Sequence, residues 1–156
     1  MSDLVVLAFA NEVDAIKMRS KLFELNQERL IQLIDAVFVV RKPDGKMIVK
    51  HEGRLADTST YQGLLLAFIY WMFYQEIAAS GTLGAPNNLQ GYIGVDVKFV
   101  SDIRRILKPG YAALFLLAAK FSKYKVMDHV QDLNATLLKT SLSKTDEALL
   151  MAVFGR

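Results

Sequence analysis

The histidines His51 and His129 are the side chains best suited to metal binding or proton transfer, and the chain contains no others. His129 stands three residues before Asp132 on an expected helix, so the two side chains could share one metal ion. Neither histidine lies in a motif with ligand spacing, and no cysteine is present to complete one. The favoured interpretation is therefore an ordinary helix or strand-end histidine. We expect no metal ion and no other cofactor.

Glu76 is the carboxylate in the most unusual position, because it closely follows the uncharged run Gly63–Tyr74. In a low-dielectric setting the pKa of its carboxyl group would rise, and its charge would require a partner. Glu76 is thus a candidate buried acid. The alternative is that it marks where a helix leaves an apolar layer. The other carboxylates are scattered, whereas acid-base catalysis needs two held close together, so no catalytic residue is predicted.

The chain has two short basic clusters, Arg104, Arg105 and Lys108, and Lys120, Lys123 and Lys125. Clustered cations can contact lipid headgroups or nucleic acid, but the solvated side of an amphipathic helix is the favoured interpretation. The balance of 19 basic and 16 acidic residues gives a net charge of only +3. This small excess does not indicate a nucleic-acid-binding protein.

The run Gly63–Tyr74 is apolar and uncharged throughout, and it contains the only tryptophan. As a helix it would span about 18 Å, well short of a hydrocarbon layer of about 30 Å. Extending it to Ala85 would place Glu76 inside the span, at a cost of up to a few kcal/mol, about 3 at the bilayer centre. A membrane-spanning helix is therefore not favoured.

The aromatic side chains of this run would point around a helix, and one domain face cannot cover them all. Exposed apolar patches of this kind usually meet a partner. We therefore expect a homo-oligomeric contact, with monotopic membrane contact as the second alternative and an intramolecular core helix as the third. The expected contact residues are Leu65, Phe68, Ile69, Tyr70, Trp71, Phe73 and Tyr74.

Hydrophobic patterning predicts the elements that must position these residues. Leu4–Ala10 is typical of a buried strand, and Asn11 is a suitable helix N-cap after it. The expected buried side of that helix is Val13, Ile16, Met18, Leu22 and Leu25. Ala36–Val40 and Met47–Lys50 are predicted to pair as a hairpin around the turn residues Lys42–Lys46.

The second half of the chain repeats this alternation. A helix is expected with an apolar side formed by Val97, Val100, Ile103, Ile106 and Leu107. Tyr111–Ala119 is continuously apolar, which predicts a central strand covered on both faces. Ser122 should cap the next helix, Ala135–Leu142 should return as a strand, and Ser143 opens a capping-box sequence for a last helix.

The pattern predicts a single α+β domain over residues 1–156. Two strand-helix-strand units, residues 3–41 and 111–142, should join in the ferredoxin-like split arrangement. Residues 52–94, which are hydrophobic and then rich in glycine and asparagine, form an insert within this domain. The inserted apolar helix belongs to that segment.

Several segments resemble a bacterial family of unknown function whose members are commonly labelled predicted membrane proteins. They are Met1–Phe9, Leu33–Lys46, Leu107–Leu117 and Leu138–Lys144, of which Thr140–Lys144 is the most specific. Members typically carry a glycine-rich and alanine-rich hydrophobic hairpin, where this chain has a bulkier aromatic run. The departure weakens the transmembrane interpretation. The family has no catalytic motif to carry over, so the resemblance supports the fold outline and leaves the function open.

We therefore predict a cytoplasmic, non-enzymatic structural or interaction protein that self-associates through its apolar helix. Peripheral membrane contact is compatible with this prediction, and no signal peptide is expected at the N-terminus. The absence of cysteine suits a reducing compartment. The alternative is a small-ligand-binding protein or enzyme with an aromatic pocket in a ferredoxin-like oligomer. Its polar group would be Glu76 or His51, and its lining Tyr61, Tyr70, Trp71, Tyr74 and Tyr92.

Overall fold

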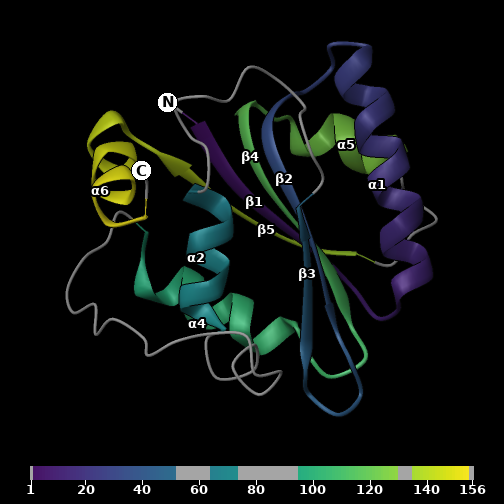
Figure 1. Ribbon diagram of the computed structural model, residues 1–156. Coiled ribbons are helices and arrows are strands. Elements are labelled where there is room, and N and C mark those ends of the chain that lie inside the picture. The colour runs from purple at the N-terminus through teal and green to yellow at the C-terminus, as the bar shows by residue number, and fades with distance from the viewer. Residues whose placement is uncertain (1, 52–63, 74–94, 130–134, 155–156) are drawn as a thin grey trace.

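The computed structural model describes residues 2–51, 64–73, 95–129 and 135–154, and these form a sheet with helices on both faces (Figure 1). The strands described are β1 (Ser2–Phe9), β2 (Gln32–Arg41), β3 (Met47–His51), β4 (Ala112–Lys120) and β5 (Ala135–Leu142). The helices described are α1 (Glu12–Gln27), α2 (Leu64–Met72), α4 (Val97–Ile106), α5 (Lys123–His129) and α6 (Lys144–Phe154). The predicted α+β class is confirmed.

The described strands lie in the order β3-β2-β4-β1-β5, and every neighbouring pair is antiparallel. β1 and β2 therefore run parallel to each other, with β4 between them. In the same way β4 and β5 run parallel, with β1 between them. Each strand-helix-strand unit is thus split by a strand from the other unit, which ties the two ends of the chain into one sheet.

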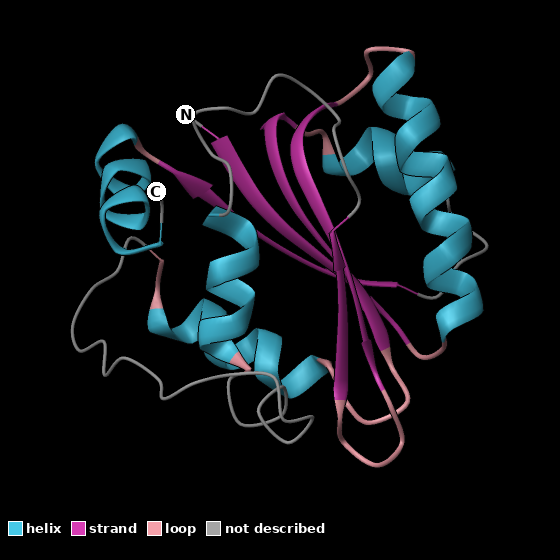
Figure 2. Ribbon diagram, viewed as in Figure 1, coloured by secondary structure: helices cyan, strands magenta, loops and turns pink. Residues whose placement is uncertain are grey.

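Helices lie on both faces of this sheet (Figure 2), and a hydrophobic core forms on each face. Successive side chains of a strand point to opposite faces, so the continuously apolar β4 supplies both cores. Phe115 lies in the core beneath α2 and α4, whereas its neighbour Leu116 lies in the core beneath α1 and α5. The prediction that this strand is central and covered on both faces is confirmed.

Helix α1 begins where the sequence indicates, because Asn11 is its N-cap and accepts a hydrogen bond from the Asp14 backbone N–H at 2.8 Å. Its buried side is Ala15, Met18, Leu22 and Leu25. Two residues of the predicted buried side are exposed, Val13 by 61% and Ile16 by 39%. At 100° per residue these two lie away from the stripe centred on Met18 and Leu22, so that part of the prediction was wrong.

The predicted buried side of α4 was also partly wrong. Phe99, Ile103 and Leu107 recur every four residues and are buried, whereas Val97, expected on the buried side, is 74% exposed. Val100 and Ile106 are only partly buried. Phe99 lies four residues before Ile103 and fills the position one turn earlier, which leaves Val97 on the outer side.

Capping at the end of the chain follows the sequence prediction. The backbone N–H of Asp146 donates to Ser143 Oγ at 3.0 Å, and the N–H of Ser143 donates to Asp146 Oδ2 at 3.1 Å. This reciprocal pair is a capping box, and it starts α6. Ser122 Oγ accepts from the N–H of Lys125 at 3.4 Å at the start of α5, so the predicted cap is confirmed there as well.

The predicted hairpin between β2 and β3 is also confirmed. Gly45 has a φ of +91°, a conformation that glycine adopts without a steric penalty. The Lys42 N–H donates to the Lys46 carbonyl and the Gly45 N–H to the Lys42 carbonyl, both at 2.8 Å. Asp44 Oδ1 accepts from the Lys46 N–H at 2.9 Å, which closes the turn with a side chain.

Candidate functional site

Helix α2 carries no charged residue, and one of its sides forms the centre of a core. Leu65, Phe68 and Ile69 are at most 1% exposed, and Phe73 just beyond the helix is fully buried. The rings of Phe73 and Phe115 are nearly perpendicular, with centroids 6.5 Å apart and an interplanar angle of 83°. This edge-to-face contact is a favoured aromatic geometry, and it places the end of α2 directly on the central strand.

The other side of α2 is apolar too, yet it is only partly buried. Leu66, Ala67, Tyr70 and Trp71 all have intermediate exposure. The Trp71 ring stacks on Phe68, with centroids 6.0 Å apart and an interplanar angle of 24°. Trp71 is therefore held by a buried neighbour while part of its surface still reaches solvent.

The predicted contact residues thus divide into three groups. Leu65, Phe68, Ile69 and Phe73 lie in the core of their own chain, as the intramolecular alternative expected for the helix. Tyr70 and Trp71 are partly exposed, and Tyr74 lies outside the described residues. The prediction of an oligomeric contact stays a prediction, and within the described helix its accessible part is the outer side, defined by Leu66, Ala67, Tyr70 and Trp71.

Arg104 fixes the end of α2 against α4. Its Nη1 donates to the Met72 carbonyl, and its guanidinium lies 5.8 Å from the centroid of the Phe73 ring. The last carbonyls of a helix have no intrahelical donor, so an arginine there satisfies one of them. Sequence reasoning placed Arg104 in a basic cluster and missed this role, because the Met72 carbonyl lies 32 residues away along the chain.

Most residues of the predicted aromatic pocket lie outside the residues that the structure describes. Glu76, Tyr61 and Tyr92 are not among the described residues. His51 ends β3 and His129 ends α5, and the structure describes only the backbone of these two histidines. Across the described part of the chain, no three acidic or histidine side chains gather as a metal site would require. The buried acid at Glu76 and the aromatic pocket stay predictions.

Asp35 is a buried carboxylate that the sequence reasoning did not single out. It is 4% exposed, and its Oδ1 accepts from the Ala36 N–H at 2.9 Å. It follows an irregularity in the pairing of β2 with β4, between Leu33 and Asp35. The signal available in the sequence was an acidic residue directly before the apolar segment of β2. The irregular register explains why the Asp35 side chain is turned inward.

Polar contacts at the same end of the sheet as Asp35 fasten the C-terminal elements to β1. Ser141 Oγ donates to Asp3 Oδ1 at 2.9 Å, and Lys139 Nζ lies 3.6 Å from Asp3 Oδ2. Ser2 Oγ donates to Glu147 Oε2 at 2.8 Å and so links β1 to α6. These contacts are structural ties between neighbouring elements.

The sequence profile of a family described as proteins of unknown function, DUF1269, matches residues 56–155. The chain belongs to this family. The match includes two of the segments that carry the resemblance, residues 107–117 and 138–144, while residues 1–9 and 33–46 precede it. No curated protein and no solved structure matched the chain. The bacterial origin and the membrane label of the resemblance stay predictions.

The DUF1269 segment contains α2, α4, β4, α5, β5 and α6, but not β1. In the sheet β1 lies between β4 and β5 and pairs with both. The strands of the DUF1269 segment are therefore joined through a strand that precedes it. Within the described residues, no helix is long and apolar enough to cross a membrane.

Proposed function

We propose that this DUF1269 protein is a non-enzymatic structural or interaction protein that self-associates through the outer side of α2. The observation that carries the proposal is the partial exposure of Leu66, Tyr70 and Trp71 on a helix with no charged residue. Surface helices normally turn a polar side to water. An uncharged outer side with aromatic residues gains free energy when a second apolar surface covers it.

The aromatic residues of this surface suit a protein contact. Tyrosine and tryptophan are enriched among the residues that dominate binding energy at interfaces. Trp71 stacks on the buried Phe68, and Arg104 holds the helix end, so the surface is largely fixed before a partner arrives. Such preorganisation reduces the conformational entropy that association would cost.

The fold proposal accompanying this function is a ferredoxin-like core with an inserted apolar helix. The order β2-β4-β1-β5 and the two split strand-helix-strand units support it. In this proposal α2 lies in the insert, residues 52–94, which β3 precedes and α4 follows, and α2 and α4 cover the face opposite α1. We also propose that the protein is cytoplasmic and works at a membrane surface. Two partly exposed aromatic residues, Tyr70 and Trp71, support that location.

Native mass measurement tests the self-association. We expect the chain to form an oligomer in light scattering coupled to size exclusion without detergent, and Tyr70→Asp and Trp71→Asp to shift it toward the monomer. Tyr124→Asp is the matched control, because Tyr124 is 82% exposed on α5, on the other face of the sheet. Circular dichroism and thermal unfolding show whether each variant keeps its fold.

The result that overturns the proposal is a native chain that stays a dispersed monomer across the measurable concentration range. An oligomer that both α2 variants leave unchanged, while they remain folded, overturns the assignment of the surface. A ligand that raises the melting temperature of the native monomer would favour the aromatic-pocket alternative instead, by stabilising the folded state it binds.

A further inference from the structure

Two turns that are far apart in the sequence meet at one end of the sheet (Figure 1). They are the β2–β3 turn, residues 42–46, and the α4–β4 turn, residues 107–111. The Arg41 N–H donates to the Tyr111 carbonyl at 2.9 Å, and the Gly110 N–H donates to the Arg41 carbonyl at 2.8 Å. Arg41 Nη1 also donates to the Leu107 carbonyl at 2.8 Å, so both turns are fixed to the same residue.

This arrangement brings most of the surplus charge of the protein together. The cationic end, as we name it, carries Arg41, Lys42, Lys46, Arg104, Arg105 and Lys108. Its carboxylates are Asp44, Asp102 and, in the first turn of α1 just after the strand end where Phe9 pairs with Ala112, Glu12 and Asp14. Asp102 pairs with Arg105 at 2.9 Å. Six cations against four carboxylates leave two net positive charges, out of the +3 of the entire chain. The rest of the molecule is therefore close to neutral.

The opposite end of the sheet shows how different the cationic end is. Near the C-terminal end of β4 the described cations are Lys21, Arg29, Lys120, Lys123, Lys125, Lys139 and Lys144. The described carboxylates near them are Asp3, Glu24, Glu28, Asp35, Asp128, Asp146 and Glu147. Cations and carboxylates balance there. The nine residues of β4 separate the two ends by about 30 Å. The excess of positive charge therefore lies at one end of the sheet.

We propose that the cationic end docks on an anionic phospholipid surface, with its lysines among the headgroup phosphates. Lys42, Lys46 and Lys108 are exposed on the two turns, so their ammonium groups can approach a flat layer of charge together. Each lysine or arginine near an anionic leaflet strengthens binding by roughly fivefold. Three such side chains on neighbouring turns favour one orientation of the protein on the membrane and also strengthen its binding.

A membrane fits this end better than a nucleic acid does. The last turn of α2 carries Tyr70 and Trp71, and Arg104 bonds to the Met72 carbonyl of that turn. Cations beside partly exposed aromatic rings are typical of residues that sit at the membrane–water interface. A nucleic acid would require cations that follow its backbone along a groove, whereas these lie at the tips of two turns. The inference rests on the membrane-surface location proposed above and not on self-association.

Flotation with lipid vesicles tests the docking. We expect the native chain to float with phosphatidylcholine vesicles that contain about one third phosphatidylserine, and not with phosphatidylcholine alone. Raising the salt from about 0.1 M to about 0.5 M should release it, because the attraction is screened. The sole tryptophan gives a second measurement, since its emission changes when it meets the lipid.

A pair of matched triple variants locates the contact. Lys42→Gln with Lys46→Gln and Lys108→Gln removes three charges from the cationic end, and should weaken partitioning onto anionic vesicles by about 100-fold. The control variant is Lys120→Gln with Lys123→Gln and Lys144→Gln, three exposed lysines of the opposite end. It changes the net charge equally and should weaken partitioning less than about fivefold.

Three outcomes overturn the inference. They are a native chain that ignores anionic vesicles, equal losses in the two triple variants, and binding to duplex DNA that depends on the same lysines without any vesicle binding. The native mass of the first triple variant separates this inference from self-association. We expect that mass to equal the mass of the native chain, because none of the three lysines lies on α2. An oligomer that fails to float therefore leaves self-association intact.

Discussion

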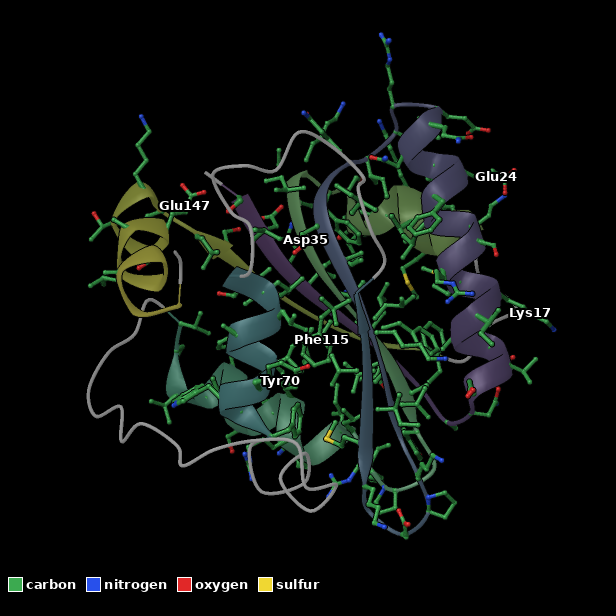
Figure 3. All side chains as sticks on the ribbon, in the orientation of Figure 1. Lys17, Glu24, Asp35, Tyr70, Phe115 and Glu147 are labelled. Carbon is green, nitrogen blue, oxygen red and sulfur yellow. The ribbon has the colours of Figure 1, made fainter. Side chains whose placement is uncertain are left out.

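The helices α1 and α2 cover opposite faces of one sheet in different ways. α1 buries Ala15, Met18, Leu22 and Leu25 and turns charged residues such as Lys17 and Glu24 to solvent (Figure 3). α2 buries Leu65, Phe68, Ile69 and Met72, and its outer side holds only uncharged residues. Both helices contribute equally apolar stripes to the two cores. They differ in what the outer side offers to water.

This difference shows that the residues a helix buries and the residues it presents to solvent can vary independently. The inner stripe of each helix is set by packing against the sheet, where a tight fit fills the space between side chains. The outer side is free to vary, because single surface substitutions change stability little. The outer side of α2 packs partly against the core through Leu66, Tyr70 and Trp71, and the part of these side chains that reaches solvent is also uncharged.

The largest expected effect is the loss of stability when a β4 side chain is truncated in either core. It tests whether the two cores unfold as one cooperative unit. Phe115 and Leu116 are neighbours in β4, are at most 1% exposed, and point into opposite cores. Phe115→Ala should lower the free energy of unfolding by about 3–5 kcal/mol and Leu116→Ala by about 2–5 kcal/mol. Equilibrium unfolding in urea measures both. A loss below about 1 kcal/mol for Phe115→Ala alone would show that the α2 layer is loosely attached.

An intermediate effect is expected where α2 meets α4. Arg104→Gln removes the charged donor to the Met72 carbonyl and should cost about 1.5–3 kcal/mol. Arg105→Gln is the matched control, since its exposed side chain pairs only with Asp102 among the described residues, and should cost about 0–1 kcal/mol. Urea unfolding followed by Trp71 fluorescence reads the α2 layer directly. Equal losses for both variants would refute the anchoring role of Arg104.

The smallest expected effect concerns the caps that begin a helix on each face. Asn11→Ala removes the N-cap of α1, and Ser143→Ala removes half of the capping box of α6. Each should lower the free energy of unfolding by about 1 kcal/mol, within a range of about 0.5–2 kcal/mol. Asn11→Ser and Ser143→Asp are conservative controls that retain an acceptor. Loss of stability in these controls equal to that of the alanine variants would contradict the capping interpretation.

Much of the element order was predictable from the sequence because its signals are local. The caps Asn11 and Ser143, the turn around Gly45 and the continuous apolar strand now seen as β4 each act within a few residues. The buried side of a helix was less predictable. Val13 and Val97 are exposed although they are apolar, since the sheet selects which side of a helix it covers.

The candidate site was predictable only in outline. The sequence located an uncharged helix in residues 63–74, and the structure has α2 at Leu64–Met72. It could not divide that helix into an inner and an outer side, because no polar residue marks the boundary. Nor could it show that Lys42 and Lys46 lie beside Lys108, because that proximity depends on hydrogen bonds between Arg41 and residues 107–111.

By itself, the sequence determined the helices and strands, their order and the uncharged character of α2. These follow from hydrogen bonding and hydrophobic periodicity along a short stretch of chain. Tertiary structure alone decided that Phe68 is buried while Trp71 stays partly exposed, and that two distant turns form one cationic end. The physical reason is that side-chain burial and charge clustering depend on which elements pack together, and the strand order β3-β2-β4-β1-β5 sets that packing.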